Sequence, residues 1–202
     1  DLYAQQGKYK LASQAYEKSY SLGKRYQTRE KIGDMQLRLH RDAEREAAEA
    51  LKANPGDPQA KAAYEEARQR RAAHAVEEFE FRIKEHPTEA RLAEMLGDAY
   101  MMRRQEGDVE AAILQYQRAL GDPRIKARTH RKLGACFAMN QATYDMALSQ
   151  FERARESSLR VEDQKEIDYE IGRLNERLGR MDYALEAYKR IYEVDAGFRD
   201  VG

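Results

Sequence analysis

The sequence predicts an all-α protein built from stacked helix–turn–helix repeats, with one long antiparallel helical hairpin inserted among them. A phrase of small and aromatic residues returns along the chain, and Gly97, Gly134 and Gly172 mark its copies at intervals of 37 and 38 residues. Internal repetition at such a period is typical of solenoids. Residues 28–87 keep the helical spacing of apolar residues but lack the phrase, which indicates an insertion of a different kind.

Each complete copy of the phrase places a Gly in one helix, then an Ala and, four positions later, an aromatic residue in the next helix. The copies are Leu96-Gly97, Ala112 and Tyr116; Leu133-Gly134, Ala147 and Phe151; and Ile171-Gly172, Ala184 and Tyr188. A helical Gly costs roughly 1 kcal/mol relative to Ala, so its return at matching places indicates close contact between helices. The aromatic residue shares a helical face with the Ala and would fill the space beside that contact. We therefore assign these residues to the core rather than to a site.

This pattern resembles the tetratricopeptide repeat (TPR) family, in its bacterial type, whose unit is a helix–turn–helix of about 34 residues. The resemblance covers 88–196 well and 1–35 in part. It implies a right-handed solenoid with a partial repeat at 1–27, the hairpin at 28–87, and, within 88–202, repeats at about 88–123, 124–160 and 163–196 followed by the start of a further helix. The chain departs from the family pattern because it has no Trp and carries an extra turn at 101–106.

Two long helices joined by a short turn are predicted over 28–53 and 57–85. Asp57 followed by Pro58 is a helix start, with an N-cap residue and then Pro at the first helical position. Each helix would be roughly 40–45 Å long at the usual helical rise. A short connection favours antiparallel packing, so we expect an arm-like hairpin.

The hairpin carries a dense mixture of acidic and basic residues. A solvated face with alternating charges is one interpretation, and a coiled-coil-like surface for docking or self-association is the other. Phe79 and Phe81 are two positions apart and cannot share a helical face. One of them should therefore contact something other than the hairpin partner, for which the adjacent repeat is the simplest candidate.

Composition narrows the classes of function. The chain has 36 basic and 36 acidic residues, and this balance counts against a nucleic-acid-binding protein. Its one cysteine, Cys136, allows neither an internal disulfide nor a thiolate metal cluster, and favours a reducing compartment. No apolar run is long enough to span a membrane, so we expect a cytoplasmic protein. Both ends fall inside repeat-like patterns, and we expect the chain to be a segment of a longer protein.

The sequence predicts no catalytic, cofactor or metal site. The four histidines, His40, His74, His86 and His130, are not at the helical spacing that places two metal ligands on one face. The chain has no glycine-rich phosphate loop and no nucleophile-turn motif. Most carboxylates lie near a Lys or Arg in the sequence, so no pair is set aside for acid–base chemistry.

In the resembled family, the first helix of each pair lines a concave groove that binds a peptide or a helix. The resemblance implies these groove residues: Arg91, Glu94, Asp98 and Met101; Arg128, Arg131, Ala135 and Met139; Glu166, Tyr169, Arg173, Glu176 and Arg177. If the four later arginines cluster, they would bind carboxylates bidentately and suit an acidic peptide. Alternatively, they pair with Glu166, Glu170 and Glu176. The asparagines of the clamp in chaperone-binding family members are missing.

The predicted function is therefore a non-catalytic scaffold or adaptor that binds a protein partner in the concave groove. Two alternatives remain open. One is a self-assembling structural module, with the hairpin at 28–87 as a possible homo-oligomer contact. The other is a regulatory segment of a larger multidomain enzyme.

Overall fold

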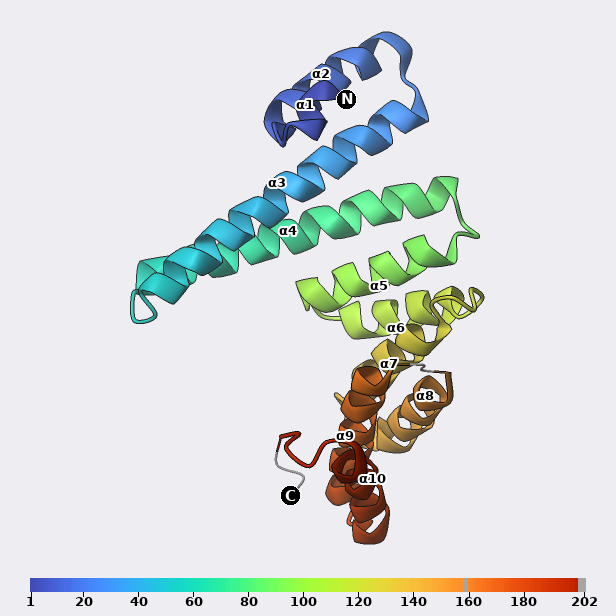
Figure 1. The fold of residues 1–202 in the computed structure, drawn as a ribbon. Coiled ribbons are helices and arrows are strands. Elements are labelled where there is room, and N and C mark those ends of the chain that lie inside the picture. Colours follow the sequence, from blue (N-terminus) through green and yellow to red (C-terminus); the bar gives the residue numbers. More distant parts are fainter. Residues whose placement is uncertain (158–159, 200–202) are drawn as a thin grey trace. The chain divides into compact units, whose positions relative to one another are not determined.

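A computed structural model describes residues 1–157 and 160–199 of the chain, and within these ranges the ordered elements are helices, with no strand (Figure 1). No helix of the described residues is long and apolar enough to cross a membrane. In order, the elements are α1 (Leu2–Gln5), α2 (Tyr9–Gly23), α3 (Tyr26–Ala53), α4 (Pro58–Glu85), α5 (Ala90–Arg103), α6 (Asp108–Ala119), α7 (Lys126–Phe137), the 3-10 helix η1 (Gln141–Thr143), α8 (Tyr144–Ser157), α9 (Val161–Arg177) and α10 (Met181–Val194).

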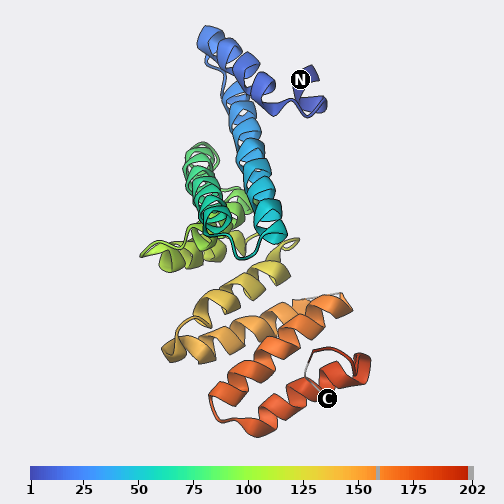
Figure 2. The same cartoon turned by 90° about the vertical axis from the view of Figure 1, so that its left-hand side faces the viewer.

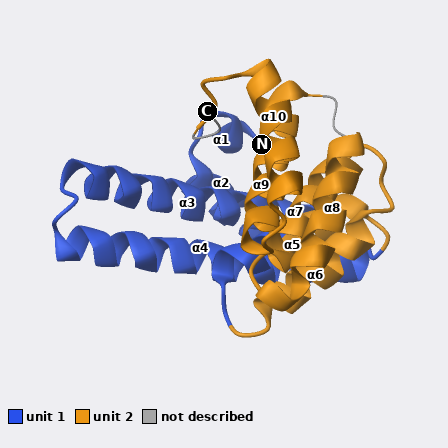
Figure 3. Cartoon of the chain, turned by 90° about the horizontal axis from the view of Figure 1, so that it is seen from below, with its two compact units in different colours: residues 1–87, 98–105 blue, residues 88–97, 106–202 orange. Residues whose placement is uncertain are grey.

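The chain forms two compact units (Figure 3). Unit 1 comprises Asp1–Pro87 and Asp98–Gln105, and unit 2 comprises Thr88–Gly97 and Glu106–Gly202. In unit 2, α7 packs against α6 and α8, α8 also packs against α9, and α9 against α10. Figure 2 shows the helices from Lys126 onward lying one beside the next. Contact between successive helices is the packing expected of a solenoid. The units divide within α5, so the predicted repeat boundaries stay a prediction.

The helical glycines lie against aromatic rings of the next helix. A Cβ on Gly134 would lie 2.9 Å from two ring atoms of Phe151, closer than real Cβ atoms approach. A Cβ on Gly97 would likewise overlap Tyr116, and one on Gly172 would overlap Tyr188. The predicted close contact between helices is confirmed, because no other side chain fits at these positions without a shift of the ring.

The turn glycines have a different reason to be glycine. Gly107 and Gly179 have φ angles of 80° and 73°, and a Cβ on either would meet nothing within 4 Å. Backbone conformation rather than space selects glycine here, because other residues rarely adopt positive φ. The predicted extra turn at 101–106 begins inside α5, which ends at Arg103. The next residue, Arg104, also has a positive φ, of 57°.

The predicted hairpin is present as α3 and α4, which have 28 residues each and pack against each other. Pro58 is the first residue of α4, and Asp57 Oδ1 accepts a hydrogen bond from the backbone N–H of Gln59 at 2.8 Å. The predicted N-cap is thus confirmed. Farther along, the rings of His40 and His74 lie 4.9 Å apart between the two helices.

A buried carboxylate takes the place of the aromatic ring in the hairpin. A Cβ on Gly33 would overlap the carboxylate of Glu78, whose residue is only 1% exposed. Glu78 accepts hydrogen bonds from Arg29 and Arg82, each at 2.8 Å. Arg82 also donates to Asp34 at 2.8 Å. The end of the hairpin that contains Gly33 is therefore a repeat-like helix pair in which an ion-pair network replaces the Gly–aromatic contact.

The two phenylalanines of α4 face opposite sides, as their spacing requires. Phe81 stacks on Tyr26 of α3 with ring centroids 5.8 Å apart, and the Arg29 guanidinium lies 4.5 Å from the Phe81 ring centre. Phe81 is therefore the phenylalanine that contacts Tyr26 and Arg29 of α3. Phe79 is buried, and its spacing places it on the other side of α4. Glu80 of α4 accepts a hydrogen bond from Tyr100 of α5 at 2.7 Å, so α4 also contacts the second part of α5 within unit 1.

Candidate functional site

Two adjoining clefts in unit 2 gather arginines where α5, α7 and α9 begin. The first arginine cleft, of about 690 Å³, is lined by 88–91, Arg118, 121–125 and Arg128. The second arginine cleft, of about 380 Å³, lies between the starts of α7 and α9 and the end of α8. Its lining residues are Arg124, Ala127, Arg128, Arg131, Ser157, Arg160, Asp163 and Ile167. Arg124 and Arg128 border both clefts and make them one continuous basic edge.

The start of α7 places cations where the helix dipole disfavours them. Lys126 and Arg128 lie in its first turn, which contains no acidic residue. A cation at a helix N-terminus is disfavoured by roughly 0.3–1 kcal/mol, whereas an anion there is favoured by a similar amount. Arg131 follows Arg128 by three residues and shares its face. The edge therefore carries positive charge from both side chains and backbone.

Glu94 of α5 holds two of the cations of α7 in place. Arg128 donates two hydrogen bonds to the Glu94 carboxylate, both at 2.7 Å, and Lys132 donates a third at 2.9 Å. Burial alone would raise the pKa of Glu94, but the hydrogen bonds from Arg128 and Lys132 outweigh it and hold the pKa below its ordinary value. Because Glu94 is 3% exposed, it acts on a ligand through Arg128 rather than by direct contact.

Two further carboxylates are paired with arginines of the links. Asp122 accepts hydrogen bonds from Arg124 at 2.9 and 3.0 Å, and these lower the pKa of Asp122. Asp163 accepts one from Arg160 at 2.9 Å, which lowers the pKa of Asp163 in the same way. In both pairs the partners are two or three residues apart in the sequence, and the arginine side chain is largely exposed. Each guanidinium has five N–H donors, so each arginine keeps donors that can reach a ligand.

Arg91 and Arg131 are the least committed cations of the edge. Both are exposed, and neither makes a hydrogen bond or ion pair with another described residue. Arg91 borders the first cleft and Arg131 the second. A bidentate acceptor such as a carboxylate could bind either without displacing an existing partner.

The structure brings together only part of the predicted arginine cluster. Arg128 and Arg131 share the second cleft, but Arg173 and Arg177 are not among its lining residues. Arg177 donates to the Tyr144 hydroxyl of α8 at 3.0 Å, and Arg173 lies 3.5 Å from Glu170. The reason is axial distance, because Arg173 follows the start of α9 by twelve residues, or roughly 18 Å. Of the predicted alternative pairings, the structure contains the weak Arg173–Glu170 contact.

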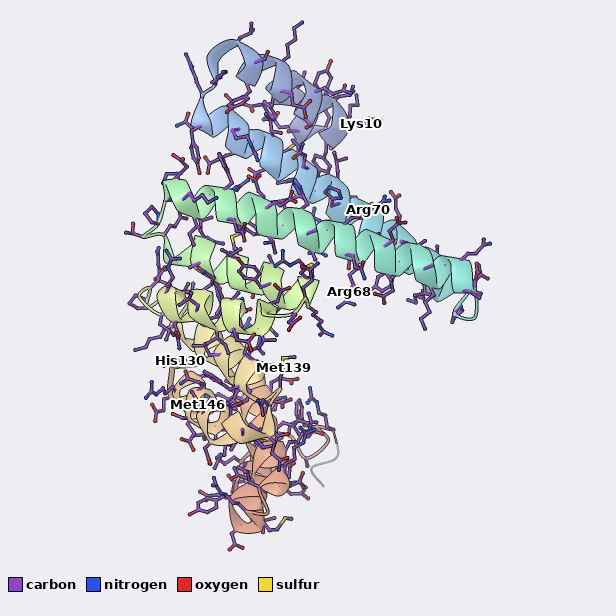
Figure 4. The ribbon with its side chains drawn as sticks, turned by 180° about the vertical axis from the view of Figure 1, so that it is seen from behind. Lys10, Arg68, Arg70, His130, Met139 and Met146 are labelled. Atoms are coloured by element: carbon purple, nitrogen blue, oxygen red, sulfur yellow. The ribbon has the colours of Figure 1, made fainter. Side chains whose placement is uncertain are left out.

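The other predicted groove residues lie outside the two clefts. Asp98 and Met101 are half-buried in the part of α5 that belongs to unit 1. Tyr169 is covered by the segment after α10, because Arg199 lies 4.4 Å from its ring centre and Phe198 stacks edge-on at 6.1 Å. Met139 is 59% exposed at the connection between α7 and α8 (Figure 4). Their contact with a ligand stays a prediction.

Sequence reasoning missed Arg118, Arg124 and Arg160. Arg118 lies in the last turn of a second helix, and the other two lie in the links just before α7 and α9. The position of Arg124 and Arg160 in the sequence could have indicated their role. A residue just before the first helix of a repeat lies beside the first turn of that helix.

No protein-family model and no curated protein sequence matches this chain. Solved structures with a similar fold do exist. The crystal structure of MamA is similar with a TM-score of 0.57 and 21% identity, over 82% of this chain and 90% of that one. A thermophilic TPR protein from Thermus thermophilus matches with a TM-score of 0.52 and 23% identity, over 96% and 94%. YrrB, described as a TPR protein with an unusual peptide-binding site, matches with a TM-score of 0.57 and 18% identity, over 92% and 95%.

These similarities establish the class of the fold. The chain has a TPR-like, all-helical fold, as the repeated phrase predicted.

Proposed function

We propose that this chain is a non-catalytic scaffold that binds an acidic segment of a protein partner. The segment would enter the groove lined by the first helices of the repeats and contact it at the two arginine clefts. The observation that carries the proposal is the convergence of Arg91, Arg128 and Arg131 with the link arginines along one edge of unit 2. The peptide-binding site ascribed to the structurally similar YrrB supports a peptide ligand.

Charge along this edge favours an anionic ligand although the whole chain is neutral. The clefts contain six arginines, whereas the carboxylates that line them are those of Glu89, Asp122 and Asp163. The dipoles of three helix starts add to this local excess. An extended acidic segment could meet Arg91 in the first cleft and Arg131 in the second, with Arg128 held between them by Glu94.

The proposal is tested by fluorescence anisotropy with a labelled Glu-rich peptide and a Lys-rich peptide of the same length. We expect the Glu-rich peptide alone to bind, and Arg91→Gln/Arg131→Gln to weaken its binding by about tenfold or more. Neither arginine makes a hydrogen bond or an ion pair with another described residue, so circular dichroism and melting should not change. Arg153→Gln/Lys52→Gln removes the same charge from exposed positions outside the clefts and should leave binding nearly intact.

Two results would contradict the proposal. One is equal binding of the Lys-rich peptide, because the edge would then not discriminate charge. The other is an equal loss in the control variant, because long-range attraction to any cation would then explain the binding.

A further inference from the structure

A third cleft in unit 2, of about 480 Å³, lies between α8, α9 and α10 and shares no lining residue with the two arginine clefts. Leu148 of α8 and Ile171 of α9 line it with apolar surface, and both residues are buried. Its polar lining includes Asn175 of α9 together with side chains of α8, of α10 and of the link between α9 and α10. We call it the Asn175 cleft.

Asn175 stands where the two preceding repeats have an aromatic residue. It follows Gly172 by three positions, and the corresponding residues of those repeats are Tyr100 and Phe137. Asn175 is only 6% exposed, and its Nδ2 donates a hydrogen bond to the Ile171 carbonyl at 2.9 Å. This bond fixes the orientation of the amide and leaves Oδ1 as an acceptor. The exchange of a ring for an amide thus puts a polar atom at a nearly buried position of the cleft.

The cleft offers three hydrogen-bond acceptors that the rest of the described chain leaves unused. They are Asn175 Oδ1, the Ser149 hydroxyl and the Glu152 carboxylate, and none of them accepts a hydrogen bond from a described residue. Ser149 and Glu152 are three positions apart on α8 and share a face of that helix. An acceptor at a nearly buried position favours a ligand that donates to it, because leaving such a group unpaired costs free energy.

Charge in the cleft favours a cationic donor. Both arginines of its lining already bind carboxylates. Arg180 donates to Asp145 at 2.6 Å. Arg190 donates at 2.9 Å to Asp168, which is buried. Glu152, in contrast, has no cationic partner among the described residues. The lining therefore offers an uncompensated negative charge, whereas its positive charges are paired.

The side of α10 that lines the cleft is not the side on which a following helix packs. The three lining residues of α10 and their counterparts in α8 are Tyr183, Glu186 and Arg190, and Met146, Ser149 and Arg153. Both α9 and α10 follow α8, yet Met146 is 51% exposed and Arg153 is exposed as well. The opening of the cleft is therefore a property of the repeats themselves.

We propose that the Asn175 cleft binds an aliphatic primary ammonium group, carried either by a lysine side chain of a partner protein or by a free diamine. An ammonium group has three N–H donors, which match the three unused acceptors. Its aliphatic stem would lie against the apolar surface of Leu148 and Ile171. The ring of Tyr183, a lining residue that is 65% exposed, offers a face to the cation.

The test is an NMR titration of the full, isotope-labelled chain with two probes, cadaverine as the free diamine and Nα-acetyl-lysine N-methylamide as the side chain of a partner. We expect at least one probe to shift the side-chain amide signal of Asn175 in a saturable way. Glu152→Gln should weaken this binding by about tenfold, because it removes the unpaired charge. Glu156→Gln is the matched control, since it removes the same charge from an exposed position one turn along α8 and outside the cleft, and it should leave binding unchanged.

Asn175→Phe provides a second, independent variant, because it restores the aromatic residue of the preceding repeats and fills the cleft. It should abolish binding of both probes while circular dichroism stays helical, and its missing side-chain signal assigns that of Asn175. If this variant does not fold, the comparison of Glu152→Gln with Glu156→Gln still decides the matter. The tighter of the two probes identifies the source of the ammonium group.

Three results would overturn the proposal. The first is the absence of saturable shifts with both amines. The second is equal binding of pentanoate or of the Nε-acetylated lysine probe, because the cleft would then not require a cation. The third is an equal loss of affinity in Glu152→Gln and Glu156→Gln, because general attraction to an acidic surface would then explain the binding.

Discussion

Gly134→Ala tests the packing of the repeats directly, because it adds one methyl group between α7 and α8. The new Cβ would lie 2.9 Å from Phe151 Cδ1 and Cε1, whereas ordinary contact begins at 3.4 Å. The ring must therefore withdraw by about 0.5 Å, by the difference of these distances. Phe151 is 2% exposed and has no open path to solvent.

Two opposing effects set the size of the change. Ala favours the helix by roughly 1 kcal/mol over Gly. Overpacking a filled core costs about 1–3 kcal/mol, and the buried ring places this site toward the upper end. We expect a net loss of about 1–2 kcal/mol, which lowers the melting temperature of a chain of this length by roughly 2–8 °C.

Thermal and urea unfolding followed by circular dichroism would measure this change. Gly23→Ala is the matched control, because its Cβ would meet its nearest neighbour only at 3.9 Å, and it should be neutral or stabilising. Adding Phe151→Leu to Gly134→Ala should cost less than Phe151→Leu does alone, since the ring that clashes is gone. If Gly134→Ala raises the melting temperature as Gly23→Ala does, the close contact is not what selects glycine here.

The hairpin supports three further predictions. Glu78→Ala should lower the free energy of unfolding by about 3 kcal/mol in urea titrations, because it leaves the buried Arg82 with fewer partners. His74 has its pKa lowered from 6.5, first by burial and then by the nearby His40. As the pH falls, the unfolded state therefore binds the proton before the folded state does. The free energy of unfolding should fall below pH 6.5, by at most about 1.4 kcal/mol per pH unit. Urea titrations at several pH values should show a flatter dependence for His74→Leu. Deleting 46–52 together with 62–68 should leave cooperative thermal unfolding intact, because no residue in these ranges is buried; a molten shortened chain would refute this.

Most of the helices could be predicted because their signals are local. The start of α4 followed from Asp57 and Pro58, and the Gly–aromatic contacts followed from residues that recur at fixed offsets. The ion-pair network that packs α3 against α4 could not be predicted in the same way. Glu78 stands where a repeat has its aromatic residue, and its burial depends on Arg29, which is 49 residues away in the sequence.

The candidate site was predictable only where helix periodicity specifies it. Arg128 and Arg131 share a face of α7, so their joint position followed from spacing. Arg173 was placed with them because it occupies a first helix, but the cluster forms at helix starts and Arg173 lies far along α9. The contribution of Arg160 depends on where the link before α9 runs, which no helical period encodes.

The hairpin is best understood as a repeat whose turn has moved outward. Helix α3 continues for twenty residues beyond Gly33, whereas α5 continues for six beyond Gly97, and this difference corresponds to about 20 Å of helix. The buried residues of α3 end at Met35, and those of α4 begin only at Ala72. The outer part is therefore held by half-exposed contacts, by surface ion pairs within each helix that contribute at most about 1 kcal/mol each, and by the pair of Arg71 with Glu44, which joins the two helices. The outer part therefore adds little to the buried core of the repeat, so the stability of unit 1 depends mainly on the residues near Gly33 and Glu78.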